Sequence, residues 1–158
     1  MSAYANFFVR HGNDFISLGD FSRNSTIYSL VSNYAPWEKI TSLTTEMLSR
    51  LVDTAEATKQ EALRLARVEK EHIDRVKTFN NSIEDKLEVI ANYENTIEEL
   101  QQEAKEARYA KHFFSFLIDI IDGARYGEHN KDVNINEYIY VGIEIGRPTV
   151  EDICEVKE

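Results

Sequence analysis

The side chains best suited to chemistry are the four histidines, the single cysteine and a pair of aspartates. No two histidines lie four residues apart, and the chain contains no HExxH or CxxC motif, so the usual spacing of a zinc site is missing. His129 has the acidic neighbours Glu128 and Asp132, which offer only a weak metal-binding group. The run Glu69–His72 is typical of a solvated helix face. The histidines are His11, His72, His112 and His129.

Asp119 and Asp122 lie beside an apolar run, and paired carboxylates near an apolar wall can perform acid–base chemistry. Their spacing of three residues is also that of the polar side of an amphipathic helix, which is the simpler interpretation. Cys154 has the acidic neighbours Asp152 and Glu155, which disfavour the reactive thiolate. No glycine-rich phosphate loop is present. The sequence therefore predicts a protein that is not an enzyme and that binds no cofactor and no metal.

The charge pattern indicates a different kind of site. Residues 84–106 contain eight acids and two bases, whereas residues 59–77 contain six bases and four acids. These charges either pair across a helical hairpin and specify its register, or form an outward acidic surface that binds a basic partner protein. Under the second interpretation, the partner-binding residues are those that crowd one segment with no base among them. They are Glu94, Glu98, Glu99 and Glu103.

Two long helices are expected to hold these carboxylates. Helical periodicity extends from residue 44 to residue 122 with one interruption at 78–81, and no proline or glycine occurs between Pro36 and Gly123. The pattern predicts a first helix from near Ser42 to about residue 79. A second helix is predicted from Ser82, as its N-cap, to Gly123, as its C-cap. Folded back on each other, the two helices form an antiparallel hairpin.

Apolar stripes at alternating steps of four and three residues predict how the two helices pack. Both stripes are thin toward the hairpin tip and rich in large side chains at its base, where a sheet is expected to pack. The first stripe is Leu48, Val52, Ala55, Lys59, Ala62, Ala66, Glu69, Ile73 and Val76, with Leu65 beside it. The second is Ile83, Leu87, Ile90, Glu94, Ile97, Gln101 and Ala104, flanked by Tyr93, Leu100 and Ala107, followed by Tyr109, Phe113, Phe116, Leu117, Ile120 and Ile121.

The segments outside the helices predict a small sheet. Residues Tyr4 to Phe21 read as a β-hairpin with its turn at 11–14, and Glu137 to Gly146 alternates aliphatic with other residues as a strand with one buried face. A brief helix is predicted over residues 26–32. Trp37, the only tryptophan, is expected to pack where the sheet meets the helices, with an exposed binding anchor as the alternative.

These elements predict a single α+β domain. A long, coiled-coil-like antiparallel helical hairpin packs at its base on a small antiparallel β-sheet of about three strands. Residues 1–41 contribute the β-hairpin and short helix, residues 42–122 the helical hairpin, and residues 123–158 a loop, a strand and a tail.

Composition narrows the classes of function. The 158 residues carry a formal net charge of −10, which disfavours direct binding to nucleic acid or to an anionic membrane. One cysteine permits no intramolecular disulfide, and the sequence shows neither a signal peptide nor an apolar run long enough to span a bilayer. A cytoplasmic location is therefore expected.

Three segments resemble small uncharacterised proteins of bacteriophages and prophages of Gram-positive bacteria. They are residues 15–23 (FISLGDFSR), residues 35–39 (APWEK) and residues 140–149 (YVGIEIGRPT). The resemblance covers most of the chain and implies no catalytic residues. It implies a setting in which small acidic proteins bind host proteins, including defence nucleases.

The expected function is accordingly that of an acidic protein–protein interaction protein. The resemblance suggests a modulator or inhibitor of a host protein, such as one that handles nucleic acid. The alternative is a structural or assembly protein that self-associates through its helical hairpin. A homodimer is expected because Leu65, Tyr93 and Leu100 flank thin stripes and offer apolar surface to another chain.

Overall fold

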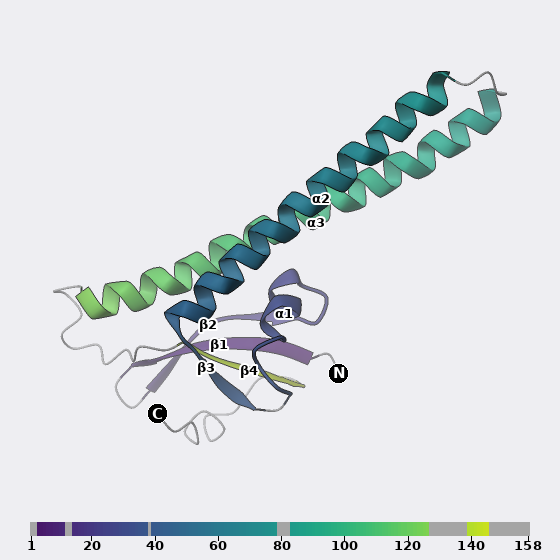
Figure 1. The fold of residues 1–158 in the computed structure, drawn as a ribbon. Coiled ribbons are helices and arrows are strands. Elements are labelled where there is room, and N and C mark those ends of the chain that lie inside the picture. The colour runs from purple at the N-terminus through teal and green to yellow at the C-terminus, as the bar shows by residue number, and fades with distance from the viewer. Residues whose placement is uncertain (1–2, 12–13, 38, 79–82, 127–138, 146–158) are drawn as a thin grey trace.

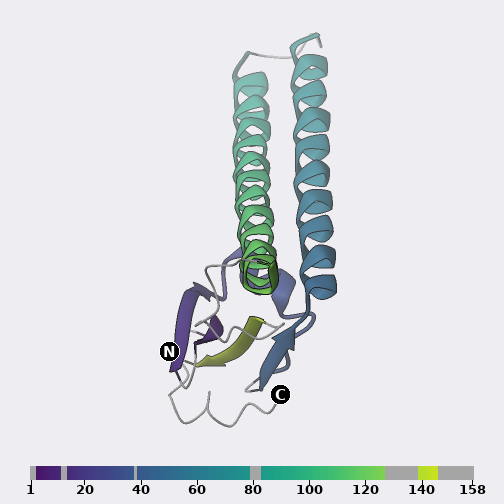
Figure 2. The same cartoon turned by 90° about the vertical axis from the view of Figure 1, so that its left-hand side faces the viewer.

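The computed structural model describes residues 3–11, 14–37, 39–78, 83–126 and 139–145. Two long helices, α2 (Thr45–Thr78) and α3 (Ile83–Tyr126), lie side by side and project from a small sheet at one end (Figures 1 and 2). At 1.5 Å per residue, α3 is roughly 65 Å long. The predicted α+β fold, a helical hairpin based on an antiparallel sheet, is confirmed.

The sheet has four strands, β1 (Ala3–His11), β2 (Asp14–Ser22), β3 (Ile40–Leu43) and β4 (Ile139–Ile145), in the order β2-β1-β4-β3. All pairings are antiparallel, and β4 joins β1 with Ala5 opposite Ile143. Ile139, Val141 and Ile143 are buried in the main core, as the alternating pattern predicted. Of the strands that the structure describes, the last one along the sequence is therefore inside the sheet and not at its edge.

Strand β3 was not predicted from the sequence. It shows that the predicted start of the first long helix, near Ser42, is wrong. Ser42, the predicted start, pairs with Tyr140 in the sheet. The helix begins three residues later, where the Thr44 side-chain oxygen accepts a hydrogen bond from the Met47 amide at 3.2 Å. Thr44 therefore acts as the N-cap. The short helix α1 (Thr26–Val31) agrees with its prediction, and Ser25 caps it by accepting from the Tyr28 amide at 3.1 Å.

The packing stripe predicted for α2 is confirmed. Five of its apolar members are buried, and the other members, including the charged Lys59 and Glu69, are half-buried. The buried members are Leu48, Ala55, Ala62, Ala66 and Ile73. Small side chains occupy the middle of the seam on both helices, which allows close approach of the two backbones. They are Ala55, Ala62 and Ala66 on α2, and Ala104, Ala107 and Ala110 on α3.

The stripe predicted for α3 is right at Ile90, Ile97 and Ala104 but wrong at three of its other positions. Leu87, Glu94 and Gln101, which were expected in the seam, are exposed, and Leu87 is 62% exposed. The side chains that turn toward α2 include the predicted flanking residues. The observed seam is Ile90, Tyr93, Ile97, Leu100, Ala104 and Ala107, in steps of three and four. Two of the three residues that suggested a homodimer, Tyr93 and Leu100, are therefore half-buried within their own hairpin.

The end predicted for α3 is also wrong. Gly123 lies inside the helix, which continues to Tyr126. It is exposed, and a Cβ atom placed on it would meet nothing within 4 Å. Glycine lowers helix propensity by about 1 kcal/mol relative to alanine, and the buried Ile121 packs the preceding turn of the helix into the core.

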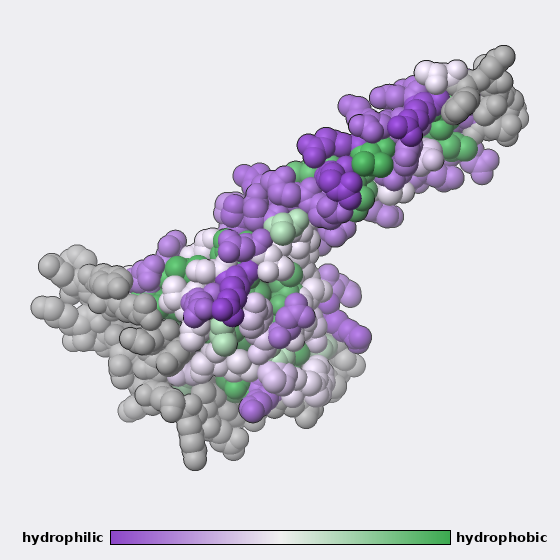
Figure 3. All heavy atoms as spheres, in the orientation of Figure 1, coloured by the Kyte–Doolittle hydropathy of each residue, from purple (hydrophilic) through white to green (hydrophobic). Residues whose placement is uncertain are grey.

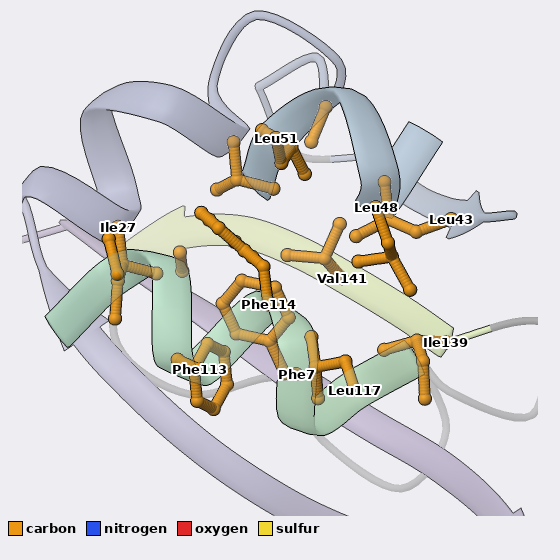
Figure 4. Close-up of a cluster of buried hydrophobic side chains, with 14 of the residues drawn as sticks. Phe7, Ile27, Leu43, Leu48, Leu51, Phe113, Phe114, Leu117, Ile139 and Val141 are labelled. Carbon is orange, nitrogen blue, oxygen red and sulfur yellow. The ribbon is translucent and has the colours of Figure 1, made fainter. Parts of the chain in front are cut away.

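The core lies where the hairpin base meets the sheet, as expected. Its side chains come from all layers of the fold, and those drawn in Figure 4 include Phe7 and Val141 of the sheet, Leu48 and Leu51 of α2, and Phe113, Phe114 and Leu117 of α3. Trp37 does not join it. This side chain is 50% exposed beside β4, so its predicted packing between sheet and helices is wrong and the binding-anchor alternative stays open.

Several predicted features lie outside the described residues. They are the Ser82 cap, most of the predicted loop with His129, and the tail with Cys154. No described helix is both long and apolar enough to cross a membrane.

Candidate partner-binding surface

The four carboxylates predicted to bind a partner lie on the middle of α3, where the hairpin extends beyond the sheet. Glu94, Glu98, Glu99 and Glu103 are all exposed. We call these four residues the acidic surface. Polar side chains dominate the projecting part of the hairpin in the view of Figure 3. The helix holds the carboxylates on a rigid backbone, so little backbone conformational entropy is lost when they meet a partner.

The acidic surface wraps around the outer side of α3 instead of forming one narrow line. Tyr93, Ile97, Leu100 and Ala104 take the inward direction, so the residues next to them in sequence point to either side. Glu94 and Glu98 share one side by their spacing of four residues, and Glu99 and Glu103 share the other. A partner could therefore approach the shaft of the hairpin from more than one direction.

Among the described residues, opposite charges rarely pair across the hairpin, although one interpretation of the sequence was that such pairs specify its register. Within α2, Arg64 binds Glu61 at 2.6 Å and Lys59 lies 3.6 Å from Glu56. Among the described residues, one ion pair joins α2 to α3, between Lys111 and Glu56 at 3.0 Å. It lies near the base, and no ion pair of the described residues includes a member of the acidic surface.

Glu56 is the polar link between the two helices. One of its oxygens accepts a hydrogen bond from Gln60 at 2.9 Å, and the other accepts from Lys111 of α3 at 3.0 Å. These bonds, that from Gln60 first, stabilise the carboxylate and lower the pKa of Glu56 to about 2. The Lys111 contact also helps to set the register of the hairpin near its base.

We expect the Glu56 link to make stability depend on pH in acid. Because the folded-state pKa of Glu56 lies below its ordinary value of 4.5, its contribution is present above about pH 4.5 and is lost as pH falls toward 2. Glu56→Gln should therefore show a flatter decline of the thermal midpoint over this range than the wild type. Circular dichroism melts at intervals of half a pH unit measure it. Glu71→Gln, which removes an exposed carboxylate of α2, is the control and should keep the wild-type slope.

The other sequence-predicted candidates are not brought together into a site. His72 is half-buried and its ring lies 5.4 Å from that of Tyr93 on α3, so the expected solvated position is wrong. Asp119 is exposed and Asp122 is half-buried, consistent with the polar side of an amphipathic helix. Within the described part of the chain, no group of three or more histidine, cysteine or acidic residues is placed to hold a metal ion.

Two exposed aromatic side chains were missed by the sequence-based prediction. Tyr109 is 60% exposed and Phe116 is 50% exposed, although both were expected in the core. Phe114, which the predicted stripe omitted, is fully buried in their place. A signal was present, because Ala110, Phe114, Leu117 and Ile121 continue the steps of three and four on the observed seam.

The chain matches no protein-family model, and searches of curated proteins and of solved structures also found no match. The resemblance to phage and prophage proteins is therefore still a prediction.

Proposed function

We propose that this protein is a non-catalytic protein–protein interaction protein that binds a basic surface of its partner through the acidic surface of α3. The observation that carries the proposal is the state of the four carboxylates. Glu94, Glu98, Glu99 and Glu103 are exposed on a rigid helix, and none takes part in an ion pair among the described residues. Carboxylates that stabilised the hairpin itself would instead be expected to pair with α2.

Elementary electrostatics indicates what such a surface does. A cluster of like charges on a protein of net charge −10 attracts lysine- and arginine-rich surfaces and raises the rate of encounter with them. The same charge disfavours direct contact with DNA or RNA. A protein that handles nucleic acid presents the required basic surface. With the resemblance to phage proteins, this chemistry supports a finer proposal, a modulator or inhibitor of a host protein that acts on nucleic acid.

Self-association is the second candidate, because apolar side chains are exposed on both helices of the hairpin. Leu65 of α2 and Leu87 of α3 are exposed, and a second copy could cover them. The half-burial of Tyr93 and Leu100 within the hairpin leaves this candidate with less apolar surface than the sequence suggested. Light scattering at high micromolar concentration tests self-association, and a strict monomer mass would exclude it.

The main proposal is tested by neutralising the acidic surface. Replacing its four glutamates by glutamine removes four charges and keeps size and helix propensity nearly constant. Proteins captured from a bacterial lysate by the wild type are identified by mass spectrometry, and their binding is then measured by surface plasmon resonance. We expect the variant to bind the specific partner at least about tenfold more weakly, mainly through a slower and less salt-dependent association.

A charge-matched control separates the acidic surface from net charge. Asp53→Asn, Glu61→Gln, Glu71→Gln and Asp74→Asn together remove four exposed charges from α2. This variant should bind the partner about as tightly as the wild type does. Equal loss of binding by both variants would assign the effect to net charge. A sharp drop in the melting temperature of the α3 variant, with unchanged binding, would show that the carboxylates serve the hairpin and would contradict the proposal.

A further inference from the structure

A groove lies between α3 on one side and β2 and the start of α1 on the other. It consists of two adjoining hollows of about 300 Å³ and about 550 Å³, which share Phe21 and Tyr109 in their linings. The larger hollow also includes Phe113 and Phe116, and the smaller one includes Glu106. Each is large enough for a bulky side chain of a partner.

The floor of the groove is a fixed aromatic cluster. The ring centres of Phe21 and Phe113 lie 4.7 Å apart, and those of Phe7 and Phe113 lie 5.0 Å apart, both in edge-to-face geometry. Gly19 makes this floor possible. Its φ of +148° is rarely adopted by other residues, and a Cβ atom there would lie 3.2 Å from the Phe21 ring. The groove is therefore formed in advance by the β1–β2 pairing, whose register shifts between Phe7 and Phe8.

The rim of the groove is an exposed aromatic wall. Tyr109 and Phe116 lie seven residues apart on α3, so they share one face of the helix. Both are largely exposed above the apolar floor. Exposed aromatic side chains over a preformed apolar hollow are typical of protein interaction sites, because they add contact area with few rotatable bonds.

The charge of the groove face changes along α3. From Phe116, steps of three and four residues lead through Phe113 and Tyr109 to Glu106, and a step of seven residues leads on to Glu99. One face of the helix is thus aromatic at the base and acidic toward the tip. Lys105 adds one positive charge to the lining of the smaller hollow. The neighbouring acidic surface outweighs it.

We propose that this groove docks a segment of the partner protein that carries a large apolar side chain followed by lysine or arginine side chains. The apolar side chain enters the hollow between Phe21 and Tyr109. The basic side chains extend along α3 to Glu106 and the acidic surface. This inference rests on the proposed function and names the chemistry of the partner. A second copy of this chain fits the groove less well, because it would bring its own carboxylates to the same acidic face.

Selection from a random dodecapeptide library displayed on phage tests the proposal without a known partner. The wild-type protein is the bait, and the enriched peptides are synthesised with a fluorescent label for anisotropy measurements. We expect them to combine a large apolar residue with lysine or arginine on one side of it. Tyr109→Ala with Phe116→Ala should weaken their binding at least about tenfold, as expected for loss of an anchor contact. Glu106→Gln should reduce the salt dependence.

Leu87→Ala is the matched control, because it shortens another exposed apolar side chain of α3 far from the groove. It should leave peptide binding unchanged. Amide shift mapping by NMR on the wild-type protein needs no variant and should place the peptide on β2 and α3 around Phe21 and Tyr109. Peptides without the expected pattern, or peptides that bind elsewhere, would overturn the proposal. A dimer that is lost in the Tyr109 and Phe116 variant would assign the groove to a second copy instead.

The two proposals fail in different ways. The groove variant keeps all four carboxylates of the acidic surface, and the four-glutamine variant keeps all the aromatic residues of the groove. In one outcome, the selected peptides need Tyr109 and Phe116 for binding, but the partner binds the four-glutamine variant as well as the wild type. This outcome would support the groove as a docking site and contradict the proposed function. The reverse pattern would retain the acidic surface and reject the groove.

Discussion

Ile143→Asp is expected to abolish the folded state or to lower its thermal midpoint drastically. Ile143 is 2% exposed, lies in the main core and is opposite Ala5 of β1 in the middle of the sheet. A carboxylate buried there without a partner costs several kcal/mol, a large share of the roughly 5–15 kcal/mol that stabilises a typical domain. Circular dichroism, with thermal or urea denaturation, measures the effect.

Two control variants separate burial of charge from other effects at this strand. Ile143→Val keeps the site apolar and should cost only about 0.5–1.5 kcal/mol. Ile16→Asp introduces the same carboxylate on the exposed part of β2 and should fold nearly as well as the wild type. A wild-type midpoint for Ile143→Asp would show that the aliphatic face of β4 is not buried as described.

The second large effect is expected for Phe114→Ala. The Phe114 side chain is fully buried between the sheet and the two long helices (Figure 4). Its truncation removes apolar contacts and leaves a cavity, for which about 3–5 kcal/mol is typical. Urea denaturation, analysed with a two-state transition, gives the change in the free energy of unfolding.

Phe116→Ala is the matched control, since it makes the same change two residues away on the same helix. Phe116 is exposed on the groove rim, so its truncation should change stability by less than about 1 kcal/mol. Similar losses for the two variants would contradict the observed orientation of α3. A larger loss for Phe116→Ala would restore the orientation that the sequence pattern suggested.

Local patterns in the sequence predicted much of the fold. The stripe of α2 and the buried face of β4 follow directly from periods of about 3.5 and 2 residues, and both are confirmed. The short helix α1, predicted over residues 26–32, likewise follows from a short-range signal. These predictions succeeded because each depends on residues within a few positions of one another.

The failures share a physical cause, which is contact with parts of the chain far away in sequence. Near the tip, α3 contacts α2, whereas at the base it also contacts the sheet, so its buried face rotates along its length. A straight helix drifts by about 20° per heptad from a strict seven-residue repeat, which adds to this rotation. At the base, contact with the sheet as well as with α2 buries Phe114 and leaves Phe116 exposed. Toward the tip, contact with α2 places Tyr93 and Leu100 in the seam.

Strand β3, which directly precedes the first long helix, could not be predicted for the same reason. Residues 40–43 make a run of four, too short to show a period, and they directly precede a strong helical pattern. Their strand conformation depends on hydrogen bonding to β4, about a hundred residues later in the chain. Pairing of this kind cannot be inferred from the segment itself.

The candidate site, like the fold, could be predicted from the sequence only in part. The crowding of carboxylates at residues 94–103 of a long helix can be predicted from the sequence, because charge and helical period are properties of the local chain. The exposure of these carboxylates to solvent, and the groove beside Tyr109, become visible in the folded protein alone. Exposure and concavity depend on which surfaces, distant in sequence, pack together. Here α2 packs against α3, and β2 packs against the base of α3. Local patterns in the sequence do not specify this packing.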